Sequence, residues 1–524
     1  MMNIFILLLI IGYSIHDIDG YGVRGQTIWQ IILCKFSDSS TPKYTPTEIK
    51  EKFLDRGTGG LADYWHDISN GLINFNSSSV NGWYTISETK EQQLKKSRNQ
   101  RFDDCVKASK LLIRASQRII VITNPGIDLW GRNKQVYTAE DHDLTLIAHE
   151  MGHAYGLAHS FSDDPNYRNI DWAQIGEYDD EWDVMSAAHV KTTNTIKYGS
   201  APPGLNGYGL ERLGWIPLNR IYTFGKKGET SATLILTTLM NPASNYPLLI
   251  RIPFDPSDYQ HYYLIEMRFK ENWDAGFHQN FVFIHEIKYN PADKNYHSYL
   301  LRTHDTSTRQ PVTSMNMNNV KITTGKINVQ TRTISVYIES NIADRCLQGY
   351  VWREAISSDH VCVTPTIRSQ TWADNAAADS RRNPSGGPFG VDTCKQGYVW
   401  REAYSSNDHV CVLPETRTQA QNDNNQATNR RNPSQFVYGP LTCRNGFVWR
   451  EADNYDYVCV TPTTRKQTAA DNAVGPLRRR PGHTCMYGYY VRNAYPNDYV
   501  CVSMSVLIQV LADNFAAISR WVFG

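Results

Sequence analysis

The spacing of apolar and polar residues divides the chain into three regions with different predicted secondary structure. In the first, residues 23–217, runs of β-branched residues at 27–33 and 117–123 predict strands. Apolar residues at helical spacing predict helices in the same region, at 46–53, 61–68, 93–113 and 144–155. Strands that alternate with helices predict an α/β layer.

The second region, residues 218–342, consists of short apolar runs separated by turns rich in Asn, Asp, Pro and Gly. The candidate strands are 232–237, 262–267, 281–284 and 333–338. This pattern predicts a β-rich domain, and a small β-sandwich is the natural form. His285 and Glu286 are adjacent here but lack metal-ligand spacing, so we expect His285 to be structural.

The third region, residues 343–524, is an array of four repeats. Each unit opens with a cysteine, continues with Gly-Tyr-Val-Trp-Arg-Glu-Ala or a variant of it, and closes on a second cysteine. In the fourth unit Val491 replaces the Trp and Asn493 replaces the Glu. Loss of the signature at the end of an array is typical of a capping repeat.

Each unit is predicted to form a small hairpin with its own disulfide, because so short a segment buries little apolar surface. The predicted pairs are Cys346–Cys362, Cys394–Cys411, Cys443–Cys459 and Cys485–Cys501. Zinc binding by these cysteines is the rival interpretation, and the lack of any Cys-x-x-Cys spacing argues against it. The segments 375–378 and 467–472 predict short helices.

An apolar run from Asn3 to Ile11 opens the chain. It is too short to span a bilayer and has the length of a signal-peptide core. We expect residues 1–22 to be a signal peptide; a buried strand is the alternative. Elsewhere the sequence has no apolar stretch long enough for an anchor, so we expect no transmembrane segment in the mature chain.

Net charge and cysteine content indicate which classes of partner and which cellular compartment to expect. The formal net charge is +1, which gives no electrostatic reason to expect nucleic acid as a partner. Ten cysteines behind a signal peptide indicate disulfides, and Asn76 opens an Asn-Ser-Ser glycosylation sequon. We therefore expect a secreted, extracellular protein.

The strongest chemical signal is the segment His-Glu-Met-Gly-His-Ala-Tyr-Gly-Leu-Ala-His that begins at His149. On a helix, His149 and His153 project from one face toward one metal ion. Gly156 can end that helix in a left-handed conformation, and the chain can then bring His159 back as a third ligand. Three histidines leave one position open, as in a catalytic zinc site, and the adjacent Glu150 is the candidate base.

A methionine downstream fits the same interpretation. Met185 lies in the segment Trp-Asp-Val-Met-Ser-Ala, which looks like the tight methionine turn found beneath some zinc sites. Its thioether would be a polarizable apolar floor and not a ligand; a single methionine taken alone is more often simple core. Because Ala187 stands two residues later, we expect no tyrosine ligand from that position.

The motif and the methionine turn together resemble the metzincin clan of zinc peptidases. Over about residues 25–340 the sequence is similar to secreted gametolysin-like and immune-inhibitor-A-like peptidases, through the segments 60–65, 82–84, 204–206, 213–215, 263–266 and 284–286. The resemblance implies an α/β (α+β) metzincin-like catalytic domain that hydrolyses protein or peptide substrates with zinc. The repeats resemble modules appended to many unrelated secreted proteins.

The chain departs from this clan in one respect. Metzincins are commonly held inactive by a propeptide, sometimes through a cysteine on the zinc. Neither Cys34 nor Cys105 lies in a recognisable pro-segment, which puts latency of that kind in doubt. The two cysteines are candidates to pair with each other.

Further expectations concern calcium and substrate. The acidic segment that holds Asp163, Asp164, Asp171, Asp179, Asp180 and Asp183 could bind Ca²⁺, although a solvated polar loop is the favoured interpretation. An extended substrate is expected beside an edge strand between Leu129 and Tyr137.

Two roles are open for the repeats. They could dock the enzyme on a cell-surface or matrix ligand through Trp352, Trp400 and Trp449, or these tryptophans could fill the small core of each unit. A different class of function is an extracellular binding or adhesion protein with a vestigial protease domain. The intact motif argues against that alternative.

Overall fold

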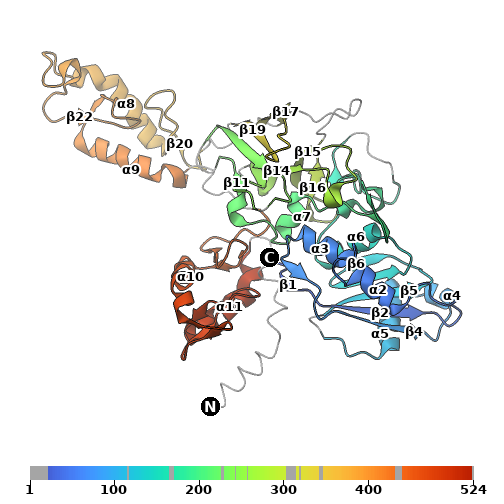
Figure 1. Ribbon diagram of the computed structural model, residues 1–524. Coiled ribbons are helices and arrows are strands. Elements are labelled where there is room, and N and C mark those ends of the chain that lie inside the picture. The colour runs from blue at the N-terminus through green and yellow to red at the C-terminus, as the bar shows by residue number, and fades with distance from the viewer. Residues whose placement is uncertain are drawn as a thin grey trace.

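The computed structural model describes residues 22–114, 117–164, 170–225, 229–241, 243–255, 258–301, 314–317, 320–340, 346–430 and 439–521 (Figure 1). The predicted signal peptide, residues 1–22, lies outside these ranges except for Gly22. Within them, no helix has both the length and the apolar character needed to cross a membrane.

The first region folds around a five-stranded sheet with the strand order β4-β2-β5-β7-β6. Its strands are β2 (Trp29–Lys35), β4 (Ser79–Thr85), β5 (Arg118–Asn124), β6 (Trp130–Arg132) and β7 (Gln135–Ala139). Neighbouring strands are parallel except at β6, which runs antiparallel to β7 at one edge. An edge strand therefore lies within 129–137, as expected.

Helices cover both faces of this sheet, so the predicted α/β layer is confirmed. Side chains alternate along a strand, and in β2 Ile31 and Leu33 belong to one apolar cluster while Ile32 and Cys34 belong to another. Cys34 is bonded to Cys105 of the second cluster, which confirms that pairing. The first cluster is covered by α2 (Pro46–Phe53), α3 (Leu61–Ile68) and α6 (Leu144–Ala154), and the second by α5 (Arg98–Ser109).

The prediction of a single helix over 93–113 is wrong. The chain forms α4 (Lys90–Leu94) and then a separate helix, α5. The Ser97 hydroxyl accepts a hydrogen bond from the Gln100 N–H, and the Gln100 side chain accepts one from the Ser97 N–H. This capping box begins a new helix, so local capping overrides the apolar period.

Residues 218–340 form the predicted β-sandwich. One sheet has the order β11-β13-β14-β15-β16-β8 and the other the order β12-β19-β18-β17. Ile250 and Ile265 of the first sheet share an apolar cluster with Val336 and Ile338 of the second. The strands are β11 (Ile221–Thr223), β12 (Ser231–Thr237), β13 (Leu249–Asp255), β14 (Asp258–Arg268), β15 (Phe281–Asn290), β16 (Asn295–Leu300), β17 (Ser314–Met317), β18 (Val320–Thr324) and β19 (Thr333–Ser340).

One strand of the sandwich comes from the first region. β8 (Phe161–Ser162) begins two residues after His159 and pairs in parallel with β16, where Phe161 lies opposite Tyr299. The sandwich therefore fixes the chain immediately beyond the predicted third ligand. Shorter connecting elements are β1 (Gly25–Gln26), β3 (Ile73–Asn74), β9 (Thr193–Thr195), β10 (Gly199–Ala201), α7 (Gly207–Arg212), η4 (Leu218–Arg220) and η5 (Asn272–Asp274).

Each repeat is a two-stranded hairpin followed by a helix, and the four predicted disulfides are confirmed. The hairpins are β20–β21 (Val351–Trp352, Cys362–Val363), β22–β23 (Val399–Trp400, Cys411–Val412), β24–β25 (Val448–Trp449, Cys459–Val460) and β28–β29 (Tyr490–Val491, Cys501–Val502). The helices are α8 (Pro365–Arg381), α9 (Pro414–Arg430), α10 (Pro462–Val474) and α11 (Met504–Arg520). They are longer than the short helices predicted within 375–378 and 467–472. The remaining short elements are η6 (Gly390–Asp392), η8 (Gly475–Arg478), β26 (Arg479–Arg480) and β27 (Thr484–Cys485).

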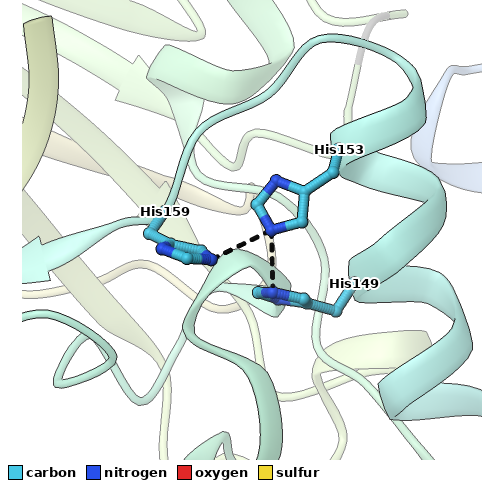
Figure 2. Close-up of side chains that lie close together, drawn as sticks. All are labelled: His149, His153 and His159. Atoms are coloured by element: carbon cyan, nitrogen blue, oxygen red, sulfur yellow. Dashed lines mark hydrogen bonds between the residues drawn. The ribbon is translucent and has the colours of Figure 1, made fainter. Parts of the chain in front are cut away.

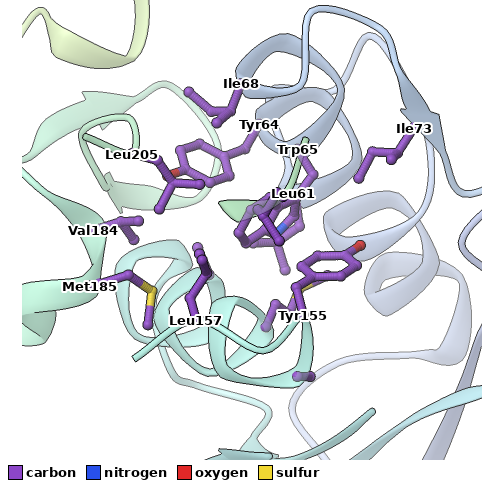
Figure 3. Packing of buried hydrophobic residues seen from close by; sticks show 14 of the residues in the cluster. Leu61, Tyr64, Trp65, Ile68, Ile73, Tyr155, Leu157, Val184, Met185 and Leu205 are labelled. Atoms are coloured by element: carbon purple, nitrogen blue, oxygen red, sulfur yellow. The ribbon is translucent and has the colours of Figure 1, made fainter. Parts of the chain in front are cut away.

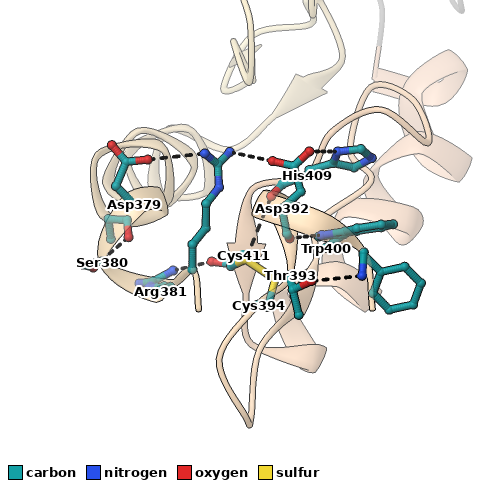
Figure 4. The surroundings of a disulfide bond; sticks show 12 residues. Asp379, Ser380, Arg381, Asp392, Thr393, Cys394, Trp400, His409 and Cys411 are labelled. Atoms are coloured by element: carbon teal, nitrogen blue, oxygen red, sulfur yellow. Dashed lines mark hydrogen bonds and ion pairs between the residues drawn. A yellow bond between two sulfur atoms is a disulfide. The ribbon is translucent and has the colours of Figure 1, made fainter. Parts of the chain in front are cut away.

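The repeats associate in two pairs by exchanging helices. Arg381, at the end of α8 in unit one, donates to the carbonyl of Cys411 in unit two, 3.2 Å away (Figure 4). Arg430, at the end of α9 in unit two, donates back to Cys362 in unit one, 3.4 Å away. Units three and four are linked in the same way, by Arg520 to Cys459 at 3.0 Å and by Arg478 to Cys501 at 3.4 Å. We call residues 346–430 the first repeat pair and residues 443–521 the second repeat pair.

The arginine of the repeat signature holds each pair together. Arg353 is buried, forms an ion pair with Asp359 at 2.7 Å, and donates to the Ala403 carbonyl of the neighbouring unit at 3.0 Å. The equivalent buried ion pairs are Arg401–Asp408, Arg450–Asp456 and Arg492–Asp498. The signature tryptophans are half-buried; Trp352 and Trp400 stack on the histidines of their own units.

The second repeat pair lies against the first region of the chain. Arg24 forms two hydrogen bonds to Asp453, at 2.7 and 3.1 Å, and its guanidinium lies 4.6 Å from the centre of the Tyr495 ring. The Leu218 N–H donates to the Asn454 carbonyl at 2.8 Å. These contacts join the start of the described chain to its end.

Candidate metal centre

Helix α6 presents the first two histidines. Asp143 caps it by accepting a hydrogen bond from the Leu146 N–H at 3.0 Å. His149 and His153 then lie one turn apart on the same side of the helix, and their Nε2 atoms are 3.0 Å from each other.

The helix ends in a Schellman turn at Gly156. The Gly156 N–H donates to the His153 carbonyl and the Leu157 N–H donates to the Gly152 carbonyl, both at 3.0 Å. Gly156 has a φ of +92°, a backbone conformation that glycine adopts without steric cost, as the sequence predicted. Beyond this turn the chain reverses and brings His159 back to the helix.

The three imidazoles converge on one point (Figure 2). The Nε2 of His153 lies 3.0 Å from that of His149 and 2.9 Å from that of His159. Within the described residues this is the one group of three or more metal-ligand side chains that meets at a single position. The structure thus brings all three predicted ligands together.

The opposite nitrogen of each ring faces a hydrogen-bond acceptor. The Nδ1 of His149 lies 3.0 Å from the Val184 carbonyl, and that of His153 lies 2.8 Å from the Leu157 carbonyl. Carbonyl oxygens only accept hydrogen bonds, so both Nδ1 atoms carry the proton. Both Nε2 atoms are therefore left with lone pairs.

The third ring follows the same rule. The Nδ1 of His159 lies 2.6 Å from the Glu177 carboxylate. The Nε2 lone pairs of neighbouring neutral imidazoles about 3 Å apart would repel each other unless a cation lay among them. Three imidazoles whose Nδ1 atoms face acceptors are a donor set that suits Zn²⁺, so the residues fit the ion that the sequence predicts.

The protonation of the histidines agrees with this role. Burial, followed by the neighbouring His153 and His159, holds the pKa of His149 well below its usual range. Burial and the His159 ring lower the pKa of His153 to about 4. Both rings are neutral at pH 7, which is the form that binds metal.

Glu150 follows His149 on α6 and contacts the edge strand β6. It is 8% exposed, and burial raises its pKa to about 7, partly offset by Arg98 and by a hydrogen bond from the Gly131 N–H. Gly131 belongs to β6, and a methyl group there would lie 2.0 Å from the Glu150 carbonyl oxygen. Only glycine lets β6 approach α6 this closely.

Met185 packs against the helix that carries the first two histidines. It lies in η3 (Val184–His189), where the Asp183 carboxylate caps the turn by accepting from the Met185 N–H at 3.2 Å. A methyl group on Gly152 would lie 2.4 Å from the Met185 sulfur, so the thioether packs directly on α6. Figure 3 shows Met185 and Val184 in the same buried cluster as Leu157 and Tyr155.

Sequence reasoning missed Glu177 and Tyr178. Glu177 orients His159, and the Tyr178 ring lies 4.4 Å from the His159 ring. No motif spacing marks either residue. The one available signal was chemical: a metal-binding histidine needs an acceptor for its second nitrogen, and acidic residues are dense after residue 159.

The other predicted residues lie apart from this centre. His285 is buried with its Nε2 3.1 Å from Asp180, as expected of a structural histidine. Within the acidic segment proposed for Ca²⁺, Asp163 pairs with Lys288 and Asp180 with His285, so these two carboxylates have separate partners. Asn76 is exposed between β3 and β4, where a sequon is accessible.

No protein-family model, curated protein or solved structure matches this chain.

Proposed function

We propose that the chain is a secreted zinc metalloendopeptidase of the metzincin type. The observation that carries this proposal is the convergence of the Nε2 atoms of His149, His153 and His159, each ring with its Nδ1 facing an acceptor. Three histidine ligands leave one coordination position for substrate chemistry. Five disulfides fit an oxidising, extracellular compartment.

In this mechanism, Glu150 moves the proton. A zinc ion in the site would make water more acidic and polarise a peptide carbonyl. Glu150 takes the proton from the attacking water and delivers it to the leaving amine, and a pKa of about 7 lets it do both near neutral pH. Glu177 and the Val184 and Leu157 carbonyls keep the imidazoles in the ligating orientation.

The substrate binds in extended form along β6. This strand ends the five-stranded sheet and lies against Glu150 through Gly131. A peptide that adds to this edge through its main chain would carry its scissile bond past the carboxylate.

A cleavage assay tests the proposal. The secreted chain should cleave casein or gelatin, and a zinc chelator or the substitution Glu150→Gln should abolish cleavage. Glu181→Gln is the matched control, because Glu181 pairs with Lys191 at the surface, and it should stay active. His153→Ala should lose the zinc that elemental analysis finds in the wild type. Full activity of Glu150→Gln contradicts the assignment; no cleavage by a zinc-loaded chain favours the binding-protein alternative.

The first repeat pair would dock the enzyme on a cell-surface or matrix ligand. The second pair is held against the rest of the chain by hydrogen bonds from Arg24 and Leu218. In the first pair, the hydrogen bonds of Arg353, Arg381 and Arg430 join its two units to each other. A chain without residues 343–438 should keep its activity on a short peptide and lose activity on a surface-bound protein. Equal activity on both substrates contradicts docking.

A further inference from the structure

A crevice of about 530 Å³ lies between the catalytic region and the second repeat pair. One wall is the turn that follows His153, through Tyr155 and Leu157, and the opposite wall is formed by Ile518 and Trp521. This volume falls in the range of small-molecule sites, and the two walls come from segments far apart in the sequence.

Cationic side chains line the crevice. Arg118, Lys134 and Arg212 line it, and among the described residues around it there is no carboxylate. The remaining lining is largely apolar. A ligand that complements this surface has one anionic group, which we call the head, attached to an apolar part, which we call the body.

Arg118 identifies where the head binds. Its side chain is 8% exposed, and its Nε is buried without a hydrogen-bond partner. Within the described part of the chain the guanidinium forms no ion pair; its neighbour is the Tyr155 ring, 5.1 Å away. Burying one guanidinium N–H without an acceptor is costly, because that group loses hydration and gains nothing equivalent. An anion in the crevice would bind the guanidinium, because guanidinium and carboxylate fit each other in two parallel hydrogen bonds.

We propose that this crevice binds an amphiphilic monocarboxylate, with its carboxylate on Arg118 and its apolar body between Leu157 and Trp521. The ligand sits behind the metal-binding turn and not in the catalytic opening. Leu157 lines the crevice, and its carbonyl accepts a hydrogen bond from His153 Nδ1, so the bound ligand contacts the residue that orients one histidine. The site does not depend on the proposed protease activity.

Calorimetric titration of the full secreted chain with decanoate tests the proposal. Decanoate should bind saturably, and 1-decanol, which has the same body without the charge, should bind at least tenfold more weakly. Arg118→Met should weaken decanoate binding by about 10- to 100-fold, as expected for loss of a charge-assisted pair. Arg118→Lys, which keeps the charge but not the fork, should fall between. Arg114→Met is the control, because Arg114 is exposed and outside the crevice.

Thermal unfolding without ligand separates a binding role from a structural one. If Arg118 serves a ligand, Arg118→Met should unfold at the same temperature as the wild type or higher, because the substitution removes the buried Nε–H that has no acceptor. The proposal is overturned if decanoate fails to bind, if it binds Arg118→Met as tightly as wild type, or if decyl phosphate binds and decanoate does not.

Discussion

Glu177 offers a sharp test of the proposed metal centre, because it contacts His159, one of the three proposed ligands, without being a proposed ligand itself. Its Oε1 lies 2.6 Å from His159 Nδ1, and its Oε2 accepts the Gln174 N–H at 2.8 Å. Burial alone would raise the pKa of Glu177, but these two hydrogen bonds outweigh it and hold the pKa below its usual value. The group is therefore ionised at neutral pH and makes the His159 ring a stronger donor to a cation.

In Glu177→Gln one of the two accepting oxygens becomes an NH₂ group. Either His159 or the Gln174 N–H then faces a donor, and the charge is lost in both cases. Changes of this kind typically weaken metal binding 10- to 100-fold, which is about 1.4 to 2.7 kcal/mol. We expect Glu177→Gln at the lower end and Glu177→Ala at the upper end.

The assay is a zinc competition titration against a chromophoric chelator, with circular dichroism to check the fold. Glu181→Gln again serves as the control, since Glu181 binds Lys191 and not a histidine. A Glu177→Gln chain that is folded and binds zinc within about twofold of the wild type would refute the reasoning, because the orienting hydrogen bond would then contribute nothing to the site.

Three other predictions follow from the fold. Replacing Cys34 and Cys105 together by Ala should lower the free energy of unfolding by about 3 to 4 kcal/mol, because the disulfide closes a loop of 71 residues; denaturant titration measures this, and a loss under about 1 kcal/mol contradicts it. Burial and the Asp180 charge raise the pKa of Asp183 to about 7. The protonated side chain therefore contributes fully to the free energy of unfolding below about pH 4, and this contribution is lost as the pH rises through 7. Asp183→Asn keeps the cap on Met185, and its stability relative to the wild type should therefore increase from pH 4 to pH 8, by at most about 4 kcal/mol; a difference independent of pH in thermal unfolding argues against this. Gly131→Ala should cost about 1 to 3 kcal/mol and reduce cleavage, because β6 must move away from Glu150; unchanged stability and activity would show that the contact is dispensable.

Local patterns predicted that the three histidines come together, but they did not predict the long-range contact of Glu177 with His159. The positions of His149, His153 and His159 follow from the helical repeat and from the backbone freedom of Gly156, both of which are local. Glu177 reaches His159 from 18 residues away, in a loop whose course depends on how β8 pairs with β16. Nothing in the sequence around Glu177 encodes that pairing.

The same division holds for the fold. The β-branched runs located β2 and β5, and cysteine spacing located the repeat disulfides. A single helix over 93–113 was predicted because the apolar period continues through Ser97, whose capping bond with Gln100 has no apolar signature. The exchange of helices between repeats depends on contacts between units, such as that of Arg381 with Cys411, and one unit's sequence shows only its own hairpin.

Because the repeats pair by exchanging helices, every unit has a partner within the chain only when the number of units is even. In each pair, the hairpin of one unit contacts the helix of the other, and the reverse contact is made as well. A single unit would lack both contacts. Loss or gain of one unit by recombination would leave one unit without a neighbour to pair with. The unpaired unit of a second copy of the chain could then pair with it. A chain with three or five repeats should therefore link to a second chain, while chains with two or four remain separate.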